Sequence, residues 1–249
     1  MFFKLVKLGD LIDRDIYDII TKKGFIMLKY FHRQVKLWGE DTQKNLQTKK
    51  IAIIGAGGLG SSLAFALGAT GIGEIHIVDF DEVSTHNIHR QIAFRLGDEG
   101  KNKALINAKI IEERCPYVTV VAHECNFVEW SKKAITVDLI IDATDNLPSR
   151  GEINSYAKKT NTPWIYGSVE AYHGQVSFIN ESSFSDAFKI ITKEPAGITA
   201  PIVMHIASLQ ANLALRYLAG LSVKKDFLYY LFFNDEGELI TQKFKLPKA

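Results

Sequence analysis

The sequence predicts an α/β fold: a Rossmann-like, doubly wound sheet, parallel in its N-terminal half and mixed or antiparallel in its C-terminal half, with a helical N-terminal extension. From Lys50 onward, apolar runs of four or five residues alternate with helical segments, which is typical of strand–helix–strand units. A glycine-rich turn directly follows the first of these runs. After Pro163 two expected strands follow each other around Gly174, which favours a mixed sheet in the second half.

The first fifty residues are expected to be helical. Asp10 can cap a helix whose apolar residues recur at helical spacing as far as Gly24, and a second short helix is expected at 40–46. We divide the chain into an N-terminal helical extension, residues 1–28, and one domain, residues 29–249. Between the two helices, the mixed aromatic and basic segment 30–34 is most simply an amphipathic stretch packed on the core.

The elements of the sheet follow in order along the chain. Strands are expected at 51–54, 74–78, 118–122 and 137–143, with helices at 61–69 and 103–114. The second half contains strands at 164–169 and 175–179, a helix at 202–218, and a hairpin of strands at 227–233 and 238–244. Residues 181–201 show no periodicity, so they are either a crossover beside the site or a surface loop with no role.

Charge and composition exclude several classes of protein. The 30 basic and 28 acidic side chains of the 249-residue chain leave a formal charge of +2, too small to predict a general nucleic-acid or membrane-surface binder. No apolar run approaches the roughly 18 residues of a membrane span. The two cysteines, Cys115 and Cys125, are too few for a disulfide-rich secreted scaffold or a four-cysteine zinc site. A cytoplasmic protein is therefore expected.

The segment Gly55-Ala56-Gly57-Gly58-Leu59-Gly60 lies between an expected strand and an expected helix, the context in which a Gly-x-Gly-x-x-Gly pattern indicates a nucleotide site. Glycines let the backbone approach a phosphate, and the start of the helix offers free N–H groups. Asp79 closes the next strand about 20 residues later, where a carboxylate can accept hydrogen bonds from a ribose. The pattern predicts a nucleotide but not which one.

Cations follow the ribose-binding acid. The run Asp79-Phe80-Asp81 is followed by Asn87-Ile88-His89-Arg90-Gln91 and then by Lys103. A dinucleotide whose pyrophosphate is already held by the glycines has little use for further cations, whereas a triphosphate needs its charge neutralised. Each cation alone could equally belong to a solvated helix face, so it is their combination that indicates a triphosphate.

Carboxylates close the fourth expected strand. Asp142 and Asp145 lie where open α/β sheets bind ligands, and Mg²⁺ takes one or two protein carboxylates together with phosphate oxygens. Asp145 is the better candidate for a magnesium ligand and Asp142 the weaker one. The alternative is that Asp145 caps a helix that begins near Leu147 or Pro148.

Together these segments resemble the bacterial ThiF/MoeB/HesA family, relatives of the adenylating domain of ubiquitin-activating enzymes. The segments that carry the resemblance are Arg33-Gln34, Leu37–Gly39, Gly55–Gly60, Asp79–Ser84, Asn87, Arg90-Gln91, Lys103, Ala143–Asn146 and His173–Val176. They stand in the family's order and cover roughly residues 29 to 220. The resemblance is therefore far more specific than a glycine pattern alone.

The resemblance implies ATP-dependent adenylation of the C-terminal glycine carboxylate of a ubiquitin-like sulfur-carrier protein, with release of pyrophosphate. The carrier would end in Gly-Gly and be of the ThiS or MoaD type, which places the reaction in thiamine or molybdopterin cofactor biosynthesis. ATP and Mg²⁺ are the implied cofactors, and a homodimer is the implied assembly. On this basis residues 29–249 form an ATP-binding adenylation domain of the ThiF/MoeB type.

The resemblance also assigns site residues by position. The nucleotide contacts would come from Gly55, Gly57, Gly58, Gly60, Asp79, Asp81, His86, Asn87, Ile88, His89, Arg90, Gln91, Lys103, Asp145 and Asn146. Arg90, Lys103 and Asp145 are the expected catalytic residues of this set, with Asp145 the expected Mg²⁺ ligand. Arg33 is the fourth, because family members supply an N-terminal arginine in trans to the γ-phosphate on the other subunit. Tyr30 stands where relatives carry a further arginine.

Two departures from the family narrow the expected chemistry. The Cys-x-x-Cys pairs that bind zinc in many relatives are missing, and His86 with His89 offers too few ligands, so no zinc site is expected. Residues 181–201 contain no cysteine, so no covalent bond between enzyme and carrier is expected. Cys115 and Cys125 are expected to be small buried hydrophobes, with Cys125 near the adenine.

Three other functions stay open. A relative of the same fold could adenylate a small carboxylate, such as a modified tRNA nucleoside, although the small net charge makes a nucleic-acid partner unexpected. A nicotinamide-dependent oxidoreductase needs only the glycine pattern and Asp79. A non-catalytic dimeric binding module needs none of Arg90, Lys103 and Asp145. The presence of these three residues together favours the adenylyltransferase.

Overall fold

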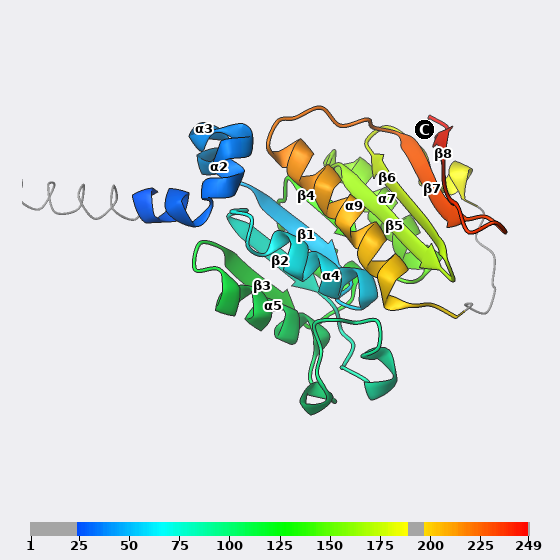
Figure 1. The fold of residues 1–249 in the computed structure, drawn as a ribbon, viewed down its shortest axis with the longest axis horizontal. Coiled ribbons are helices and arrows are strands. Elements are labelled where there is room, and N and C mark those ends of the chain that lie inside the picture. The colour runs from blue at the N-terminus through cyan, green and yellow to red at the C-terminus, as the bar shows by residue number, and fades with distance from the viewer. Residues whose placement is uncertain (1–23, 189–196, 249) are drawn as a thin grey trace, which may run out of the picture.

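The computed structural model describes residues 24–188 and 197–248. The helix expected at 10–24 lies outside the described residues except at its last position. Residues 24–30 are helical, and two short helices follow, α2 (His32–Trp38) and α3 (Glu40–Leu46). The helix expected at 40–46 is confirmed, and the basic segment before it forms a helix of its own. Both α2 and α3 lie near the start of the first strand (Figure 1).

One sheet of eight strands runs through the described part of the chain, in the order β3-β2-β1-β4-β5-β6-β7-β8 (Figure 1). Its strands are β1 (Lys50–Ile54), β2 (Glu74–Val78), β3 (Thr119–His123), β4 (Leu139–Asp142), β5 (Trp164–Glu170), β6 (His173–Ile179), β7 (Phe227–Phe233) and β8 (Leu239–Lys245). Neighbours from β3 to β5 pair in parallel, and neighbours from β5 to β8 pair antiparallel. The predicted doubly wound sheet, parallel first and antiparallel later, is confirmed.

Helices cover both faces of this sheet. On one face lie α4 (Gly58–Leu67), α5 (Lys103–Arg114) and α9 (Ala200–Leu218); on the other lie α6 (Phe127–Ser131), α7 (Leu147–Thr160) and α8 (Phe184–Ala187). Alternate residues of β1 enter two separate cores, Ile51 and Ile53 on the α4 face and Ala52 and Ile54 on the α7 face. Burial on both faces explains the continuous apolar runs in the sequence. Within the described ranges, no helix is long and apolar enough to cross a bilayer.

Most predicted boundaries agree with the structure within one or two residues, and α5 begins and ends where predicted. Helix α4 begins at Gly58, three residues earlier than expected, because glycines have low helix propensity and hide the first turn. Helices α6 and α8 were not predicted, since elements this short show no helical period. Residues 181–201 therefore contain a short helix, and their expected crossover role stays untested because residues 189–196 lie outside the described ranges.

The order of the strands fixes where a ligand can bind. The chain winds from β1 through β2 to β3 on one side, and then returns to β4 on the other side of β1. At such a reversal the loops that leave the carboxyl ends of the two neighbouring strands diverge, and the crevice between them is the usual ligand position in open α/β sheets. Gly55, Asp79 and Asp145 follow β1, β2 and β4, so all three lie at this edge.

Two buried histidines form a polar chain between β2 and β3. The Nζ of Lys133 lies 3.3 Å from His123 Nδ1, and His123 Nε2 lies 2.9 Å from His76 Nδ1. His76 Nε2 in turn lies 2.8 Å from Glu74 Oε1. Because an ammonium group only donates and a carboxylate only accepts, both neutral rings carry their proton on Nε2. Burial lowers the pKa of both histidines, and the pKa of His123 falls to about 4.

We expect the free energy of unfolding to fall as the pH drops from 6.5 towards about 4. Across this window both histidines are protonated in the unfolded chain but stay neutral in the folded chain. Acid therefore favours the unfolded state. Urea denaturation at several pH values measures the effect. His123→Gln is expected to flatten the pH dependence, whereas His86→Gln, at an exposed position, is expected to leave it unchanged. Wild-type stability that stays constant across the window would contradict the expectation.

Candidate functional site

The loop between β1 and α4 depends on two glycines. Gly55 has a φ of +99°, and a Cβ there would lie 2.5 Å from the carbonyl oxygen of Ala143. A Cβ on Gly60 would lie 2.1 Å from the carbonyl oxygen of Gly55. Helix α4 can therefore pack this close to the end of β1 only because residue 60 has no side chain. Gly57 is the N-cap of α4, and no side chain of the described residues caps the helix. The first N–H groups of α4 are therefore left for an anionic ligand or water.

Asp79, directly after β2, is held by two backbone donors. Its Oδ2 accepts a hydrogen bond from the N–H of Ala56 at 2.6 Å, and its Oδ1 accepts one from the N–H of Asp81 at 2.8 Å. Burial raises the pKa of the Asp79 carboxyl, and the two N–H donors act against this rise. Each carboxylate oxygen keeps a free lone pair, which suits the predicted contact with ribose hydroxyls.

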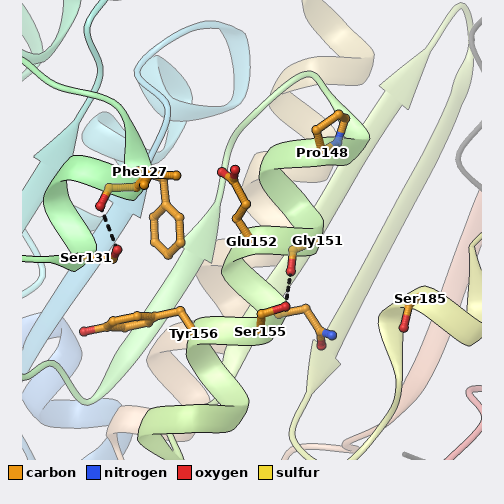
Figure 2. A pocket seen from close by; sticks show the side chains of 10 residues that line it. Phe127, Ser131, Pro148, Gly151, Glu152, Ser155, Tyr156 and Ser185 are labelled. Atoms are coloured by element: carbon orange, nitrogen blue, oxygen red, sulfur yellow. Dashed lines mark hydrogen bonds between the residues drawn. The ribbon is translucent and has the colours of Figure 1, made fainter.

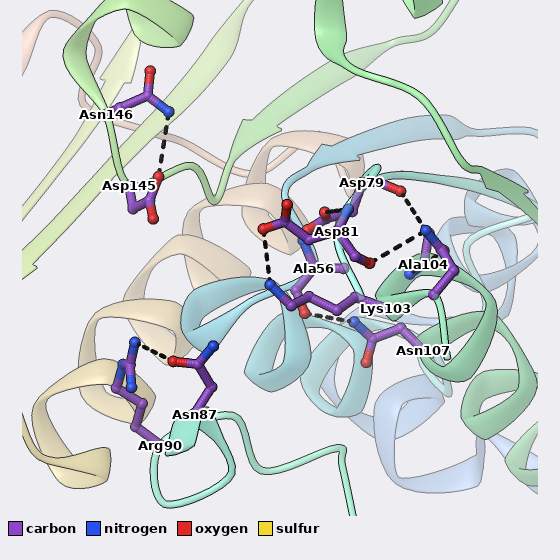
Figure 3. A network of polar contacts seen from close by, with 11 residues as sticks. Ala56, Asp79, Asp81, Asn87, Arg90, Lys103, Ala104, Asn107, Asp145 and Asn146 are labelled. Atoms are coloured by element: carbon purple, nitrogen blue, oxygen red, sulfur yellow. Dashed lines mark hydrogen bonds and ion pairs between the residues drawn. The ribbon is translucent and has the colours of Figure 1, made fainter. Parts of the chain in front are cut away.

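Asn107, which the sequence analysis did not single out, holds the same loop from α5. It is fully buried, and its Nδ2 donates to the carbonyl oxygen of Ala56 at 3.1 Å (Figure 3). Ala56 is thus fixed through both of its backbone groups, the N–H by Asp79 and the C=O by Asn107. The signal available in the sequence was an asparagine on the core-facing side of an amphipathic helix, since a buried amide needs a specific partner.

Lys103, the first residue of α5, is buried and paired with Asp81. Its Nζ lies 2.9 Å from Asp81 Oδ2, and its backbone N–H donates to the carbonyl oxygen of Asp81 (Figure 3). Asn102 caps α5 by accepting from Ala104 N, and its Nδ2 donates to the carbonyl oxygen of Asp79 at 3.0 Å. Asp79, Asp81 and Lys103 therefore form one connected group beside the glycine loop.

Arg90 belongs to a turn that packs against the start of α4. The connection from β2 to α5 contains two 3-10 helices, η1 (Thr85–Asn87) and η2 (Leu96–Asp98). Arg90 donates from NH2 to Asn87 Oδ1 at 2.9 Å, and its NH1 lies 3.0 Å from His89 Nε2. The carbonyl oxygen of Arg90 lies 3.7 Å from the position that a Cβ on Gly58 would take. The backbone of Arg90 thus lies close to the helix start, and its guanidinium group is tethered within the same turn.

The same turn is anchored by its apolar and amide side chains. Ile88 packs against a small cluster formed by Val83, Ala93 and Phe94. Gln91 is buried, its Nε2 lies 3.3 Å from the position of a Cβ on Gly57, and its Oε1 has no hydrogen-bond partner within the described residues. Since buried polar atoms are normally paired, a ligand donor beside the glycine loop would satisfy this oxygen. His86 is exposed.

The end of β4 excludes one of the two magnesium candidates. Asp142 is fully buried, and its Oδ2 accepts from Arg150 Nε at 3.0 Å. Its Oδ1 accepts from the backbone N–H and the hydroxyl of Thr144, at 2.9 and 2.6 Å. Burial raises the pKa of the Asp142 carboxyl, while the Arg150 guanidinium acts to lower it. With both oxygens engaged and no access to solvent, Asp142 is not a magnesium ligand, and this prediction is wrong.

The helix cap at the start of α7 is Asn146. Its Oδ1 accepts from the N–H of Ser149 at 2.9 Å, so the alternative that Asp145 caps this helix is wrong. The Asp145 carboxylate is exposed, and across the described chain its one hydrogen bond comes from Asn146 Nδ2 at 3.2 Å (Figure 3). An exposed carboxylate whose oxygens are largely free is the type of donor that Mg²⁺ prefers.

Arg33 lies at the opposite edge of the sheet from these residues. It is exposed on α2, near the start of β1, whereas the glycine loop follows the end of β1 (Figure 1). A strand advances about 3.3 Å per residue, so the five residues of β1 separate Arg33 from the loop by more than one side chain can span. Tyr30 packs instead against Phe31 and Tyr117. Within one chain the structure does not bring Arg33 to the site.

These residues fit a magnesium-bound triphosphate by charge and by donor type. An uncapped helix start and the two cations Arg90 and Lys103 are suited to phosphate oxygens. Asp145 supplies an exposed carboxylate for a hard cation. For zinc the fit is poor, because no three His, Cys, Asp or Glu side chains in ranges 24–188 and 197–248 come together as ligands.

The two cysteines and one surface hollow complete the description. Cys115 is buried, as predicted; Cys125 is partly buried against the core, and its expected position near an adenine stays a prediction. A hollow of about 480 Å³ is lined by residues of α6 and α7 and by Ser185 of α8. Figure 2 shows Phe127 and Tyr156 on one side of it and Ser185 on the other. None of the predicted site residues lines it.

An aromatic row lies on β6 and β7, in the antiparallel half of the sheet. It consists of His173, Tyr230 and Phe232, with ring centroids 5.7 Å apart for His173 and Tyr230 and 5.2 Å apart for Tyr230 and Phe232. Tyr172 beside it is 63% exposed. Because β6 and β7 pair antiparallel after β5, the start of β6 and the end of β7 lie at the edge where the glycine loop lies. Rings grouped on an accessible sheet face are suited to contact with another molecule.

The sequence is similar to one known family and to adenylyltransferases from several organisms. The sequence pattern of the ThiF family matches residues 31–249. The chain is 31% identical over 214 residues to the adenylyltransferase and sulfurtransferase MOCS3 of Caenorhabditis briggsae, covering 81% of this chain and 53% of that protein. It is 29% identical over 215 residues to the sulfur carrier protein adenylyltransferase of Thermus thermophilus, covering 78% of this chain and 79% of that protein. The chain thus spans about half the length of the MOCS3 relative.

Solved structures share the fold. The Escherichia coli MccB structure with ATP has a TM-score of 0.76 at 20% identity, covering 88% of this chain and 71% of that chain. A structure of PaaA has a TM-score of 0.72 at 22% identity, covering 100% of this chain and 77% of that chain. At this level of identity the likeness establishes the architecture alone.

Proposed function

We propose, from the premise that this chain belongs to the ThiF family, that it is an adenylyltransferase that uses ATP to activate the C-terminal glycine carboxylate of a ubiquitin-like sulfur carrier. One observation carries the proposal most strongly. Two cations, Lys103 and Arg90, and an exposed carboxylate, Asp145, belong to three separate segments that follow β2 and β4 on the side of the uncapped start of α4 (Figure 3). A nicotinamide cofactor has a diphosphate bridge but no triphosphate chain to occupy such a set.

We assign the nucleotide to the residues around the glycine loop. Asp79 accepts hydrogen bonds from the ribose, and the phosphates lie against the backbone of 55–60, with Arg90 and Lys103 as their cations. The further contacts are assigned to Asp81, His86, Asn87, Ile88, His89, Gln91 and Asn146. Lys103 is paired with Asp81 at 2.9 Å, so a triphosphate would compete with Asp81 for the ammonium group. Asp145 would hold Mg²⁺, which supplies charge neutralisation at the phosphate oxygens.

The reaction needs positioning more than acid or base catalysis. A carboxylate oxygen of the carrier attacks the α-phosphorus of ATP, and the bond to the bridging oxygen of pyrophosphate breaks, so that pyrophosphate leaves with the electron pair. Because the attacking carboxylate is already an anion at neutral pH, no side chain has to remove a proton. The cations keep the two anions together and stabilise the charge that builds up on pyrophosphate.

A protein as second substrate is supported by the aromatic row. Its rings lie towards the edge of the sheet at which the glycine loop lies, and they offer a contact surface larger than a small carboxylate needs. The carrier would serve thiamine or molybdopterin biosynthesis, as the resemblance to ThiF and MoeB implies. Residues 181–201 contain no cysteine, so we take the acyl-adenylate as the final product of this chain. Two free thiols agree with the reducing cytoplasm as its compartment.

Carrier-dependent exchange of labelled pyrophosphate into ATP tests the proposal. With Mg²⁺ and a carrier ending in Gly-Gly, we expect exchange; with the same carrier lacking its last glycine, we expect none. The truncated carrier controls for contaminating ATPases. Folded protein that supports no exchange with any ubiquitin-like carrier of the source organism would rule the proposal out.

We assign Arg33 to the site of a second subunit in a homodimer. The assignment is supported by the exposure of Arg33 and by its distance from the glycine loop of its own chain. Tyr30, whose hydroxyl donates to the carbonyl oxygen of Arg114, cannot supply a second cation at this position. The γ-phosphate contact would therefore rest on Arg33 alone.

A subunit-mixing experiment checks this assignment. Arg33→Ala and Arg90→Ala subunits are each expected to be inactive as homodimers, and mixing them is expected to restore about one quarter of the wild-type sites, since half of the dimers are mixed and each holds one complete site. Exchange activity after denaturation and joint refolding measures the recovery. Verified mixed dimers without recovered activity would mean that each site is built within one chain.

A further inference from the structure

A buried polar network lies directly beneath the loop that carries Asp145. Arg150 of α7 is buried; its Nε donates to Asp142 at 3.0 Å, and its NH2 donates to the carbonyl oxygens of Thr144 at 2.8 Å and Gly167 at 3.1 Å. Its guanidinium carbon lies 5.2 Å above the ring of Tyr166. Arg150 thus joins β4, the loop after it, α7 and β5 through one side chain.

Helix α9 is tied to the same point. Gln210 is fully buried, and its Nε2 donates to the carbonyl oxygen of Asp142 at 2.6 Å. A Cβ on Gly167 would lie 2.3 Å from Gln210 Nε2, so a glycine in β5 is what lets this amide reach the end of β4. The side chain and the carbonyl of Asp142 are therefore both held, by residues from the loop, α7 and α9.

The buried ion pair between Arg150 and Asp142 is not expected to add much to the stability of the fold. Removing two charges from water costs several kcal/mol per ion, and well-packed apolar residues of similar volume often serve stability equally well. What such a pair with all its hydrogen bonds provides is a single defined geometry. The geometry it defines here is that of residues 142–146, because Thr144 is bound through its N–H, its hydroxyl and its carbonyl oxygen.

Asp145 is the next residue after Thr144, and its own side chain is hardly restrained. In the described chain its carboxylate has one hydrogen bond, from the neighbouring Asn146, and it is exposed. Asn146 in turn is fixed by capping α7 through Ser149 N. The direction in which Asp145 points is therefore set by the backbone on either side of it, and that backbone is held by Arg150 and by the helix cap.

We infer that Arg150, through its pair with Asp142, is a positioning residue that aims the Asp145 carboxylate at the metal of the nucleotide. This inference rests on the proposed function, since it takes Asp145 as the metal ligand. Arg150 itself is buried and does not touch the nucleotide. It acts as the outer partner of a metal ligand does, and loss of such a partner typically weakens metal binding about 10- to 100-fold.

A double-mutant cycle on metal affinity tests the inference without relying on turnover. The probe is Mn²⁺, bound to the full chain in the presence of a non-hydrolysable ATP analogue and measured by electron paramagnetic resonance. Arg150→Lys is expected to weaken Mn²⁺ binding about 10- to 100-fold, because lysine cannot make the forked contacts to Asp142, Thr144 and Gly167. In the Asp145→Ala background, the same change is expected to have almost no further effect.

A matched control separates positioning from general destabilisation. Ile153→Ala, on the same helix and fully buried, is expected to lower the free energy of unfolding but to leave Mn²⁺ affinity unchanged. Thr144→Val removes one donor to Asp142 and keeps the ion pair, so it provides a milder variant if Arg150→Lys does not fold; its smaller loss of Mn²⁺ affinity should also vanish without Asp145.

Two results would overturn the inference. One is an equal loss of Mn²⁺ affinity from the Arg150 or Thr144 substitution with and without Asp145, and the other is an equal loss from Ile153→Ala. Failure of the proposed function is distinguishable, because wild-type protein would then show no carrier-dependent pyrophosphate exchange. Normal wild-type exchange together with additive losses would reject the positioning role alone.

Discussion

The Arg90→Ala variant is expected to lose carrier-dependent pyrophosphate exchange by about 100- to 1,000-fold, the usual effect of removing one charged donor aimed at a developing charge. The guanidinium group is tethered to Asn87 Oδ1 at 2.9 Å, in a turn whose backbone packs against the start of α4, where we assign the phosphates. Pyrophosphate gains negative charge as it leaves, and a cation fixed in advance stabilises that charge without reorganisation. The loss should therefore appear mainly in kcat.

The fold should survive this substitution. Arg90 is only half-buried, and its hydrogen-bond partners, Asn87 and His89, keep access to water, so no buried charge is left unpaired. The control is Lys101→Ala, which removes a cation from the same connection at a residue whose exposed ion pair is with Asp98. Exposed pairs contribute about 0–1 kcal/mol to stability, and Lys101 has no assigned role in the site. Arg90→Ala with near-normal exchange would mean that the triphosphate lies elsewhere.

Gly60→Ala is expected to destabilise the chain by about 1–3 kcal/mol, the cost of overpacking a site without free space. The added methyl group would lie 2.1 Å from the carbonyl oxygen of Gly55, so either α4 or the glycine loop has to move. Both movements displace the backbone that we assign to the phosphates, and nucleotide affinity should fall along with stability. Thermal unfolding and calorimetric titration with an ATP analogue measure the two effects.

Gly151→Ala provides a matched control in another helix. Gly151 lies within α7, and a Cβ there meets nothing within 4 Å. Helix propensity therefore favours alanine over glycine by about 1 kcal/mol at Gly151. The same propensity gain applies at Gly60, but there the added methyl group meets the carbonyl oxygen of Gly55. Opposite signs for the two variants are expected, destabilising at Gly60 and stabilising at Gly151. The same sign at both positions would show that the contact between α4 and the end of β1 is not rigid.

The sheet could be predicted because its strands are buried on both faces. Ile51 to Ile54 and Glu74 to Val78 form compact apolar runs, and α5 shows a clear helical period. The start of α4 was placed too late because the glycines that make the phosphate-binding turn possible also disguise a helix. Helices α6 and α8 have five and four residues, too few for any period to appear.

The predicted site differs from the structure where tertiary contacts decide a role. Asp142 and Asp145 look alike in sequence, three positions apart after the same strand. Only the buried Arg150 from the next helix shows that one is structural and the other exposed. Asn107 was missed for the same reason, because nothing local reveals that it meets the carbonyl oxygen of Ala56. Arg33 was chosen from the family resemblance, and its distance from the loop within one chain is why we assign it to the site of a second subunit.

The central claim is that this chain forms an acyl-adenylate on the terminal glycine of a carrier protein. Trapping with hydroxylamine followed by intact mass analysis of the carrier tests it directly, because an acyl-adenylate becomes a stable hydroxamate at the carboxylate that was activated. We expect the hydroxamate on the C-terminal glycine, formed only with ATP and Mg²⁺, and absent with the Arg90→Ala variant. An unmodified carrier, or a product that forms equally on a carrier without its last glycine, would contradict the claim.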